Sequence, residues 1–325
     1  MNSSSSGFNV STPSYRDSYS TVVAKNVIVL ILGFIINYIN GSLIHTFRKH
    51  QIFYVNPRYI LFIHLVVNDM IQLTTTISLF VLSYIFYRIN VSLCCLIITF
   101  SVFTTLNTPL NVAFMAVECY IAICLPLRHA ELCTIKRTYI LIGSIWAMSA
   151  VSTLPDVFIL LATEPVELFY STIFCQKDIL FRHPIHLKNR EVSYAVYLVV
   201  VWLTLLYTYI KIILAAKTAK VSKSADGETN KARNTILLHG FQLLLCMLTY
   251  VAHLIRKALV YSFPEHYIQG IFASYIIVQI LPRLVSPIVY GLRDNTFRQH
   301  LKKYLLCTMR PSIKPWTSPK IMLLY

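Results

Sequence analysis

Two opposite charges lie inside long apolar runs of this sequence. Asp69 occurs in LVVNDM and Arg283 occurs in LPRLVSPIVY. An ionisable side chain in an apolar environment is costly, and such residues usually face a protein interior and pair with one another. Their similar depth in the two runs predicts a direct or water-bridged ion pair. The alternative is that Arg283 reaches water along the protein while Asp69 is neutral or hydrated.

The remaining polar residues do not form a recognisable catalytic centre. The sequence contains no nucleophile elbow, no HExxH, no P-loop and no GxGxxG, and its ionisable residues are scattered. Its eight cysteines include no CxxC pair and no Cys/His spacing typical of zinc. We therefore expect no enzyme activity, no cofactor and no metal site.

The composition indicates that lipid is the solvent around much of the chain. Apolar residues make up 56% of the 325 residues and charged residues only 13%, which is more apolar surface than one soluble core can cover. About 20 helical residues cross a hydrocarbon core of about 30 Å. Seven stretches reach that length: 22–46, 59–86, 94–124, 138–162, 192–216, 235–260 and 268–290. The predicted fold is an all-α membrane protein, a seven-transmembrane-helix bundle.

The distribution of Lys and Arg predicts the orientation. With the N-terminus outside, 18 of these residues fall on the inner side and 9 on the outer side, as the retention of positive charge in the cytoplasm requires. The net charge of +16 therefore reflects topology, and no nucleic-acid partner is expected. The first 20 residues lack an apolar region typical of a signal peptide. We expect an extracellular segment 1–21, a seven-span domain 22–290 and a cytoplasmic segment 291–325.

Glycosylation sequons agree with this orientation. Asn2 and Asn9 begin sequons in the outer N-terminal segment and are the predicted glycan sites. The sequon at Asn90 also lies outside, although it is close to the membrane. Asn40 begins a sequon within the first span and is expected to be a packing residue.

Three cysteines lie on the outer side, where disulfides persist. Cys94 and Cys95 open the third span, and Cys175 is in the long outer loop after the fourth span. One disulfide to Cys175 is expected, and these residues leave the choice between Cys94 and Cys95 open. Free buried thiols are the alternative.

A face of small hydroxyls in the third span is a candidate ligand site. Ser101, Thr105 and Thr108 follow the spacing i, i+4 and i+7, so they share one side of a helix. They are expected to line a pocket, or alternatively to pack and bond helices together. No carboxylate in the outer half of this span could serve a cationic amine. Similar candidates in the sixth and seventh spans are Tyr250, His253, Leu254, Tyr275 and Gln279.

Three segments together resemble a known family. The third span contains MAVECYIAICLPLRH (115–129), which resembles the olfactory signature MAYDRYVAICxPLxY. The sixth contains KARNTILLHG (231–240), which is similar to KAxxTCxxHL, and the seventh contains PRLVSPIVYGLRDNTFR, which is similar to PxxNPxIYxxRNxxxK. Over nearly its whole length the chain resembles the rhodopsin-like receptors, and within them the olfactory receptors, most closely those of fish.

The resemblance implies roles for single residues. Asp69 matches the acid of the family's sodium pocket, and Trp146 matches the packing tryptophan of the fourth span. The implied disulfide joins Cys94 to Cys175, because Cys94 lies 25 residues before Cys119, the family's usual interval.

The resemblance also implies parts in and after the seventh span. Pro287 and Tyr290 match the kink and the switch tyrosine of that span. A short basic amphipathic helix after Gly291 would contact membrane lipid on the inner leaflet, with Cys307 as a candidate acylation site.

The sequence departs from the family at three positions. The segment Glu118, Cys119 and Tyr120 occupies the acid-arginine-tyrosine motif, so the usual lock between the acid and the arginine cannot form. Constitutive signalling or a different lock would follow. Ser286 replaces the common asparagine before the proline, and Arg283 puts a fixed cation near the sodium pocket. We expect Arg283 to make sodium dispensable.

The function implied by the resemblance is that of an odorant receptor. A small-molecule odorant among the outer halves of the third, fifth, sixth and seventh spans would favour a state whose inner side binds a G protein. In the family this partner is a stimulatory olfactory-type G protein that raises cyclic AMP, and the location is the plasma membrane of olfactory sensory neuron cilia. The alternatives are a rhodopsin-like receptor for a lipid or peptide ligand, and a transporter or channel.

Overall fold

The computed structural model describes residues 18–86, 88–181, 184–221, 241 and 267–285 of the chain. The long helices are α1 (Tyr19–Lys49), α2 (Pro57–Phe86), α3 (Val91–Cys124), α5 (Ile135–Thr163) and α8 (Pro184–Val221). Shorter elements are the 3₁₀ turn η1 (Gln51–Phe53), α4 (Pro126–Leu132), α6 (Val166–Tyr170), α7 (Lys177–Leu180), α10 (Tyr267–Tyr275) and the π-helical turn η3 (Ile276–Ile280).

Five helices within these residues are long and apolar enough to cross a membrane. They comprise Tyr19–Lys49, Pro57–Ser83, Val91–Cys124, Ile135–Thr163 and Val192–Ala215. A shorter apolar helix, Phe272–Val285, lies within the seventh expected span. The expected sixth span and the expected helix after Gly291 lie outside the described residues. The membrane-bundle prediction is therefore confirmed for the part of the chain that is described.

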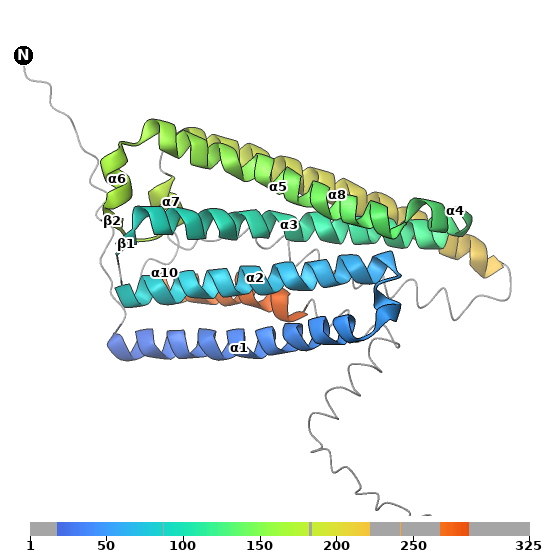
Figure 1. The fold of residues 1–325 in the computed structure, drawn as a ribbon, viewed down its shortest axis with the longest axis horizontal. Coiled ribbons are helices and arrows are strands. Elements are labelled where there is room, and N and C mark those ends of the chain that lie inside the picture. Colours follow the sequence, from blue (N-terminus) through green and yellow to red (C-terminus); the bar gives the residue numbers. More distant parts are fainter. Residues whose placement is uncertain (1–17, 87, 182–183, 222–240, 242–266, 286–325) are drawn as a thin grey trace, which may run out of the picture.

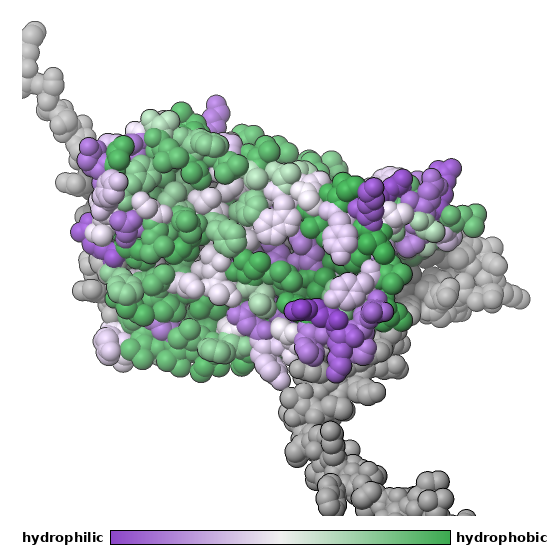
Figure 2. Space-filling model, in the orientation of Figure 1, coloured by the Kyte–Doolittle hydropathy of each residue, from purple (hydrophilic) through white to green (hydrophobic). Residues whose placement is uncertain are grey.

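The surface of these helices suits lipid. Side chains such as Phe34, Leu96 and Val151 are more than half exposed although they are apolar. Figure 2 shows apolar residues covering the length of the bundle on the visible face, with polar residues gathered toward its ends. Exposed apolar patches of this extent require an apolar solvent.

Helix α3 lies at the centre of the described bundle. It packs against α2, α5 and α8, while α1 packs against α2 (Figure 1). The main apolar core joins these helices through fully buried side chains such as Leu65, Met115 and Ile145. Asn40 of α1 is also completely buried, which confirms that it is a packing residue.

A small sheet and a disulfide close the outer end of α3. Strand β1 (Ile89–Asn90) pairs antiparallel with β2 (Thr172–Ile173), a short pairing that adds to the confirmed all-α bundle. The Asn90 side chain caps α3 by accepting hydrogen bonds from the backbone N–H groups of Ser92 and Leu93. Cys94 and Cys175 form a disulfide with Cα atoms 5.6 Å apart, which confirms the pairing that the resemblance implied.

Candidate functional site

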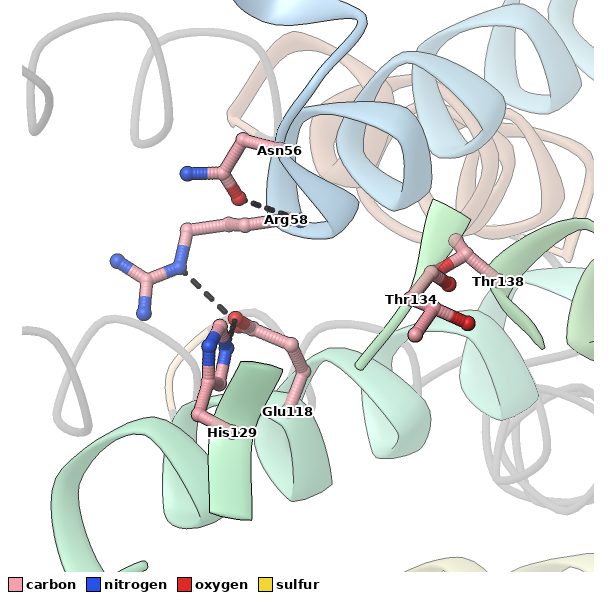
Figure 3. A network of polar contacts seen from close by, with 6 residues as sticks. All are labelled: Asn56, Arg58, Glu118, His129, Thr134 and Thr138. Carbon is pink, nitrogen blue, oxygen red and sulfur yellow. Dashed lines mark hydrogen bonds and ion pairs between the residues drawn. The ribbon is translucent and has the colours of Figure 1, made fainter. Parts of the chain in front are cut away.

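The Glu118 carboxylate lies near the inner end of α3 and is held by two side chains. Arg58 Nε donates to Glu118 Oε2 at 3.1 Å, and His129 Nε2 lies 3.1 Å from Glu118 Oε1 (Figure 3). The Glu118 side chain is only 7% exposed, whereas those of Arg58 and His129 are 33% and 29% exposed. We call these three residues the Glu118 clasp. It links α2, α3 and α4.

Local structure places both partners of Glu118. The Asn56 side chain accepts a hydrogen bond from the Arg58 backbone N–H at 3.0 Å, which fixes Arg58 in the first turn of α2. Helix α4 begins at Pro126, a residue suited to a helix start because its missing N–H needs no partner there. His129 follows three residues later, on the turn that packs against α3.

Cys119 stands at the position where the family has an arginine, and its side chain packs toward α8. Its side chain is 2% exposed and packs with Ile212 of α8. The neighbouring Tyr120 ring lies 5.9 Å from the Tyr207 ring of α8 in an edge-to-face arrangement. This position therefore contributes apolar packing between α3 and α8, and the ionic partners of Glu118 come from other helices.

A second polar group joins α2 to α3 within the membrane. Asn68 Nδ2 donates to the Thr104 carbonyl and to Thr108 Oγ1, both at 3.0 Å, and Asn107 Nδ2 donates to Asn68 Oδ1 at 3.2 Å. Thr108 Oγ1 donates to Asp69 Oδ1 at 3.4 Å. All these side chains are buried, so the contacts form a connected network between the two helices.

Two residues of the hydroxyl face make hydrogen bonds between helices. The Thr108 hydroxyl bonds α2 side chains, and the Thr105 hydroxyl accepts a hydrogen bond from Gln72 of α2. Thr105 and Thr108 therefore contribute to helix packing, and their part in lining a pocket stays a prediction. Ser101 lies one turn further out and is half-buried, and its assignment to a pocket stays a prediction.

The seventh span places two candidate ligand residues around a π-helical turn. Tyr275 ends α10 and its ring stacks on Phe80 of α2 at 4.9 Å between centroids. Gln279 lies in η3, and its buried Oε1 has no hydrogen-bond partner among the residues that the structure describes. Single π turns often occur at functional sites, and the assignment of Tyr275 and Gln279 to a ligand pocket stays a prediction.

Arg283 is buried and bonded within its own helix. Its Nη1 donates to the Val278 carbonyl at 2.9 Å, and the residue is 3% exposed. The guanidinium satisfies a carbonyl of the π turn, and its direct or water-bridged pairing with Asp69 stays a prediction, as does the dispensability of sodium.

Replacing Arg283 with Met should destabilise the protein as strongly as replacing Asp69 with Asn. Methionine leaves the Val278 carbonyl without its donor, a loss of about 1–3 kcal/mol for a buried polar group. Thermal unfolding of the purified variants would measure this. An Arg283→Met variant with an unchanged melting temperature would contradict a role for the guanidinium.

A polar cluster that was not predicted from the sequence lies between the outer halves of α5 and α8. His186 Nδ1 lies 3.2 Å from Asp156 Oδ1, and the Tyr197 hydroxyl lies 3.0 Å from Ser152 Oγ. Lys177 Nζ donates to the Tyr194 hydroxyl at 2.8 Å. Asp156 in the apolar fourth span carried the same signal as Asp69 and would have identified this cluster.

Trp146 of α5 is a packing residue, as the resemblance implied. Its Nε1 donates to His64 Nε2 at 2.8 Å, and its ring lies 5.1 Å from Phe103. The other predicted residues lie outside the described part of the chain: Asn2, Asn9, Tyr250, His253, Leu254, Pro287, Tyr290 and Cys307.

Comparisons with known proteins agree with this architecture. Residues 39–290 match the family model described as "7 transmembrane receptor (rhodopsin family)". The chain is also similar to Odorant receptor 131-2 of Danio rerio, with 32% identity over 287 residues, covering 88% of this chain and 87% of the relative. The family model covers α2, α3, α5 and α8 completely and α1 from residue 39 onward.

Proposed function

Because the chain belongs to the rhodopsin family of seven-transmembrane receptors, we propose that it is an odorant receptor that activates a stimulatory olfactory-type G protein and raises cyclic AMP. The family match confirms that the chain is a multi-pass membrane receptor and is not an enzyme. It gives no support to the transporter or channel alternative. The observation that carries the proposal is the 32% identity to an odorant receptor over 88% of the chain.

The ligand chemistry follows from the polar atoms available near the outer half of the seventh span. Within the described part of the chain, Gln279 Oε1 has no hydrogen-bond partner, and a carbonyl oxygen accepts a hydrogen bond. The outer half of α3 carries hydroxyls and no carboxylate, so it offers no counter-ion to an amine. These features favour a small neutral odorant with a hydroxyl group. The hydroxyl would bond Gln279 while the apolar part packs against neighbouring side chains.

The proposed mechanism is a shift between two states of the bundle. A ligand that binds the active state more tightly raises its population, and the inner side then binds the G protein. We place the receptor in the plasma membrane of olfactory sensory neuron cilia. Expression in other tissues alone would favour the second candidate, a receptor for a lipid or peptide ligand.

The test is cyclic AMP in cells that express the chain with an olfactory-type G protein. A panel of neutral, acidic and amine odorants is applied, with receptor-free cells as the control and a surface-exposed N-terminal tag to verify delivery. We expect a response to at least one hydroxyl-bearing neutral odorant. A flat response from receptor that has reached the surface would contradict the proposed coupling.

Replacing Gln279 with Leu should raise the half-maximal concentration of that odorant roughly tenfold, which corresponds to the loss of one buried hydrogen bond. Gln51→Leu, at the inner end of the bundle, is the matched control and should leave the concentration unchanged. Dose-response curves of cyclic AMP measure both variants. Equal sensitivity of the two variants would remove Gln279 from the pocket.

A further inference from the structure

The Glu118 carboxylate is buried in a position that requires compensation. Both of its oxygens have a partner, one on Arg58 and one on His129. A buried carboxylate that loses such partners is strongly disfavoured, because its charge is no longer balanced. The buried charge at the inner end of α3 is therefore balanced by residues that belong to α2 and α4.

The two partners lie at a boundary that water can reach. Their side chains are about one-third exposed, so each contact is weaker than a fully buried ion pair. A contact of this kind can open without unfolding the bundle. Opening would release α4, whose seven residues contribute no buried side chain of their own.

We propose that Arg58 and His129 are positioning residues for Glu118, and that the Glu118 clasp holds α4 against α3 and restrains basal signalling. The restraint of signalling rests on the proposed function, whereas the holding of α4 does not. With cysteine at position 119, this clasp takes the place of a lock between adjacent residues of α3. Signalling in the absence of ligand is thereby limited by contacts between three helices.

Cys133 offers a probe of α4 that needs no G protein. Its backbone N–H bonds the His129 carbonyl at 2.9 Å at the end of α4, and its thiol is half-buried outside the disulfide. Burial raises the pKa of the Cys133 thiol, the charge of Glu118 raises it further, and Arg137 lowers it. Release of α4 would expose the thiol and speed its alkylation.

The experiment measures alkylation of Cys133 with N-ethylmaleimide in the full-length receptor, by mass spectrometry of the peptide that carries it. The variants are Arg58→Ala, His129→Ala and the conservative Arg58→Lys. Lys136→Ala is the matched control, because Lys136 is an exposed cation in the first turn of α5, whereas Arg137 donates to the Glu131 carbonyl of α4 and is left in place. This control removes a cation without removing a described bond to α4, so its alkylation rate should not rise.

We expect Arg58→Ala and His129→Ala to raise the alkylation rate about fivefold, as loss of a partly exposed ion pair implies. For Arg58→Ala this direction is opposite to the electrostatic effect of removing a cation, which separates opening from a change in thiol pKa. Arg58→Lys should restore the rate of the unmodified receptor. An unchanged or slower rate in both alanine variants would overturn the proposal.

Basal cyclic AMP supplies the second measurement. If the clasp restrains signalling, both alanine variants should at least double the ligand-independent level, while Lys136→Ala does not. If odorants activate the unmodified receptor but basal signalling is unchanged in the variants, restraint by the clasp is overturned. If alkylation rises and no receptor form signals at all, the G-protein coupling has failed while the holding of α4 is supported.

Discussion

Replacing Cys94 with Ser is expected to remove most of the receptor from the cell surface. The disulfide to Cys175 closes a loop with a sequence separation of 81 residues and ties the outer loop to the start of α3. By chain entropy alone, a bridge across a loop of this length stabilises a protein by about 4.5 kcal/mol. Such a loss is a large fraction of the stability of most domains, and a destabilised membrane receptor is retained and degraded.

The adjacent residue provides the control for this prediction. Cys95 is buried but outside the disulfide, so Cys95→Ser changes the same chemistry one position away. Flow cytometry with an N-terminal tag would measure surface receptor for both variants. We expect a reduction of about tenfold for Cys94→Ser and a small change for Cys95→Ser. Equal surface levels in the two variants would show that the disulfide is dispensable.

Replacing Asn68 with Ala should cause the next largest loss of stability. The Asn68 side chain makes three hydrogen bonds to α3, through the Thr104 carbonyl, Thr108 and Asn107. Hydrogen bonds between membrane helices contribute about 0.6 kcal/mol each on average. Loss of all three should therefore lower the free energy of unfolding by about 2 kcal/mol. We expect the melting temperature of the purified receptor to fall by roughly 4 °C.

Asn37 is the matched control for Asn68. It lies on α1 and makes one hydrogen bond to Thr74 of α2 at 3.2 Å. Asn37→Ala should therefore lower the melting temperature by about one-third as much. A double-mutant cycle with Asn107→Ala would further isolate the contact between Asn68 and Asn107. Equal shifts for Asn37→Ala and Asn68→Ala would contradict a central role for the network.

Features that depend only on residues close together in the sequence could be predicted from the sequence. The lengths of the apolar runs and the segments around Glu118 were enough for the membrane-bundle and family predictions, because a span must match the bilayer within its own residues. The expected start of the first span at residue 22 lies three residues inside the observed start of α1 at Tyr19. Boundaries depend on capping and differ by a few residues for that reason.

The cysteine that pairs with Cys175 could not be identified from the neighbouring residues alone. The residues alone left both cysteines open, and the resemblance favoured Cys94. The structure confirms it because Cys94 is completely buried beside Cys175 near the small β1–β2 sheet. Adjacent residues on a helix point about 100° apart, so only one of the two can face the loop.

By itself, the sequence determined that this protein is a bundle of membrane helices, and it predicted that most of the positive charges lie on the inner side, since hydropathy and charge act on each segment separately. Tertiary structure alone decided which polar groups meet. Glu118 bonds Arg58, 60 positions earlier, and the Thr105 and Thr108 hydroxyls bond α2. Such contacts depend on how each helix is rotated and shifted against its neighbours, and that rotation follows from the packing of all the helices together.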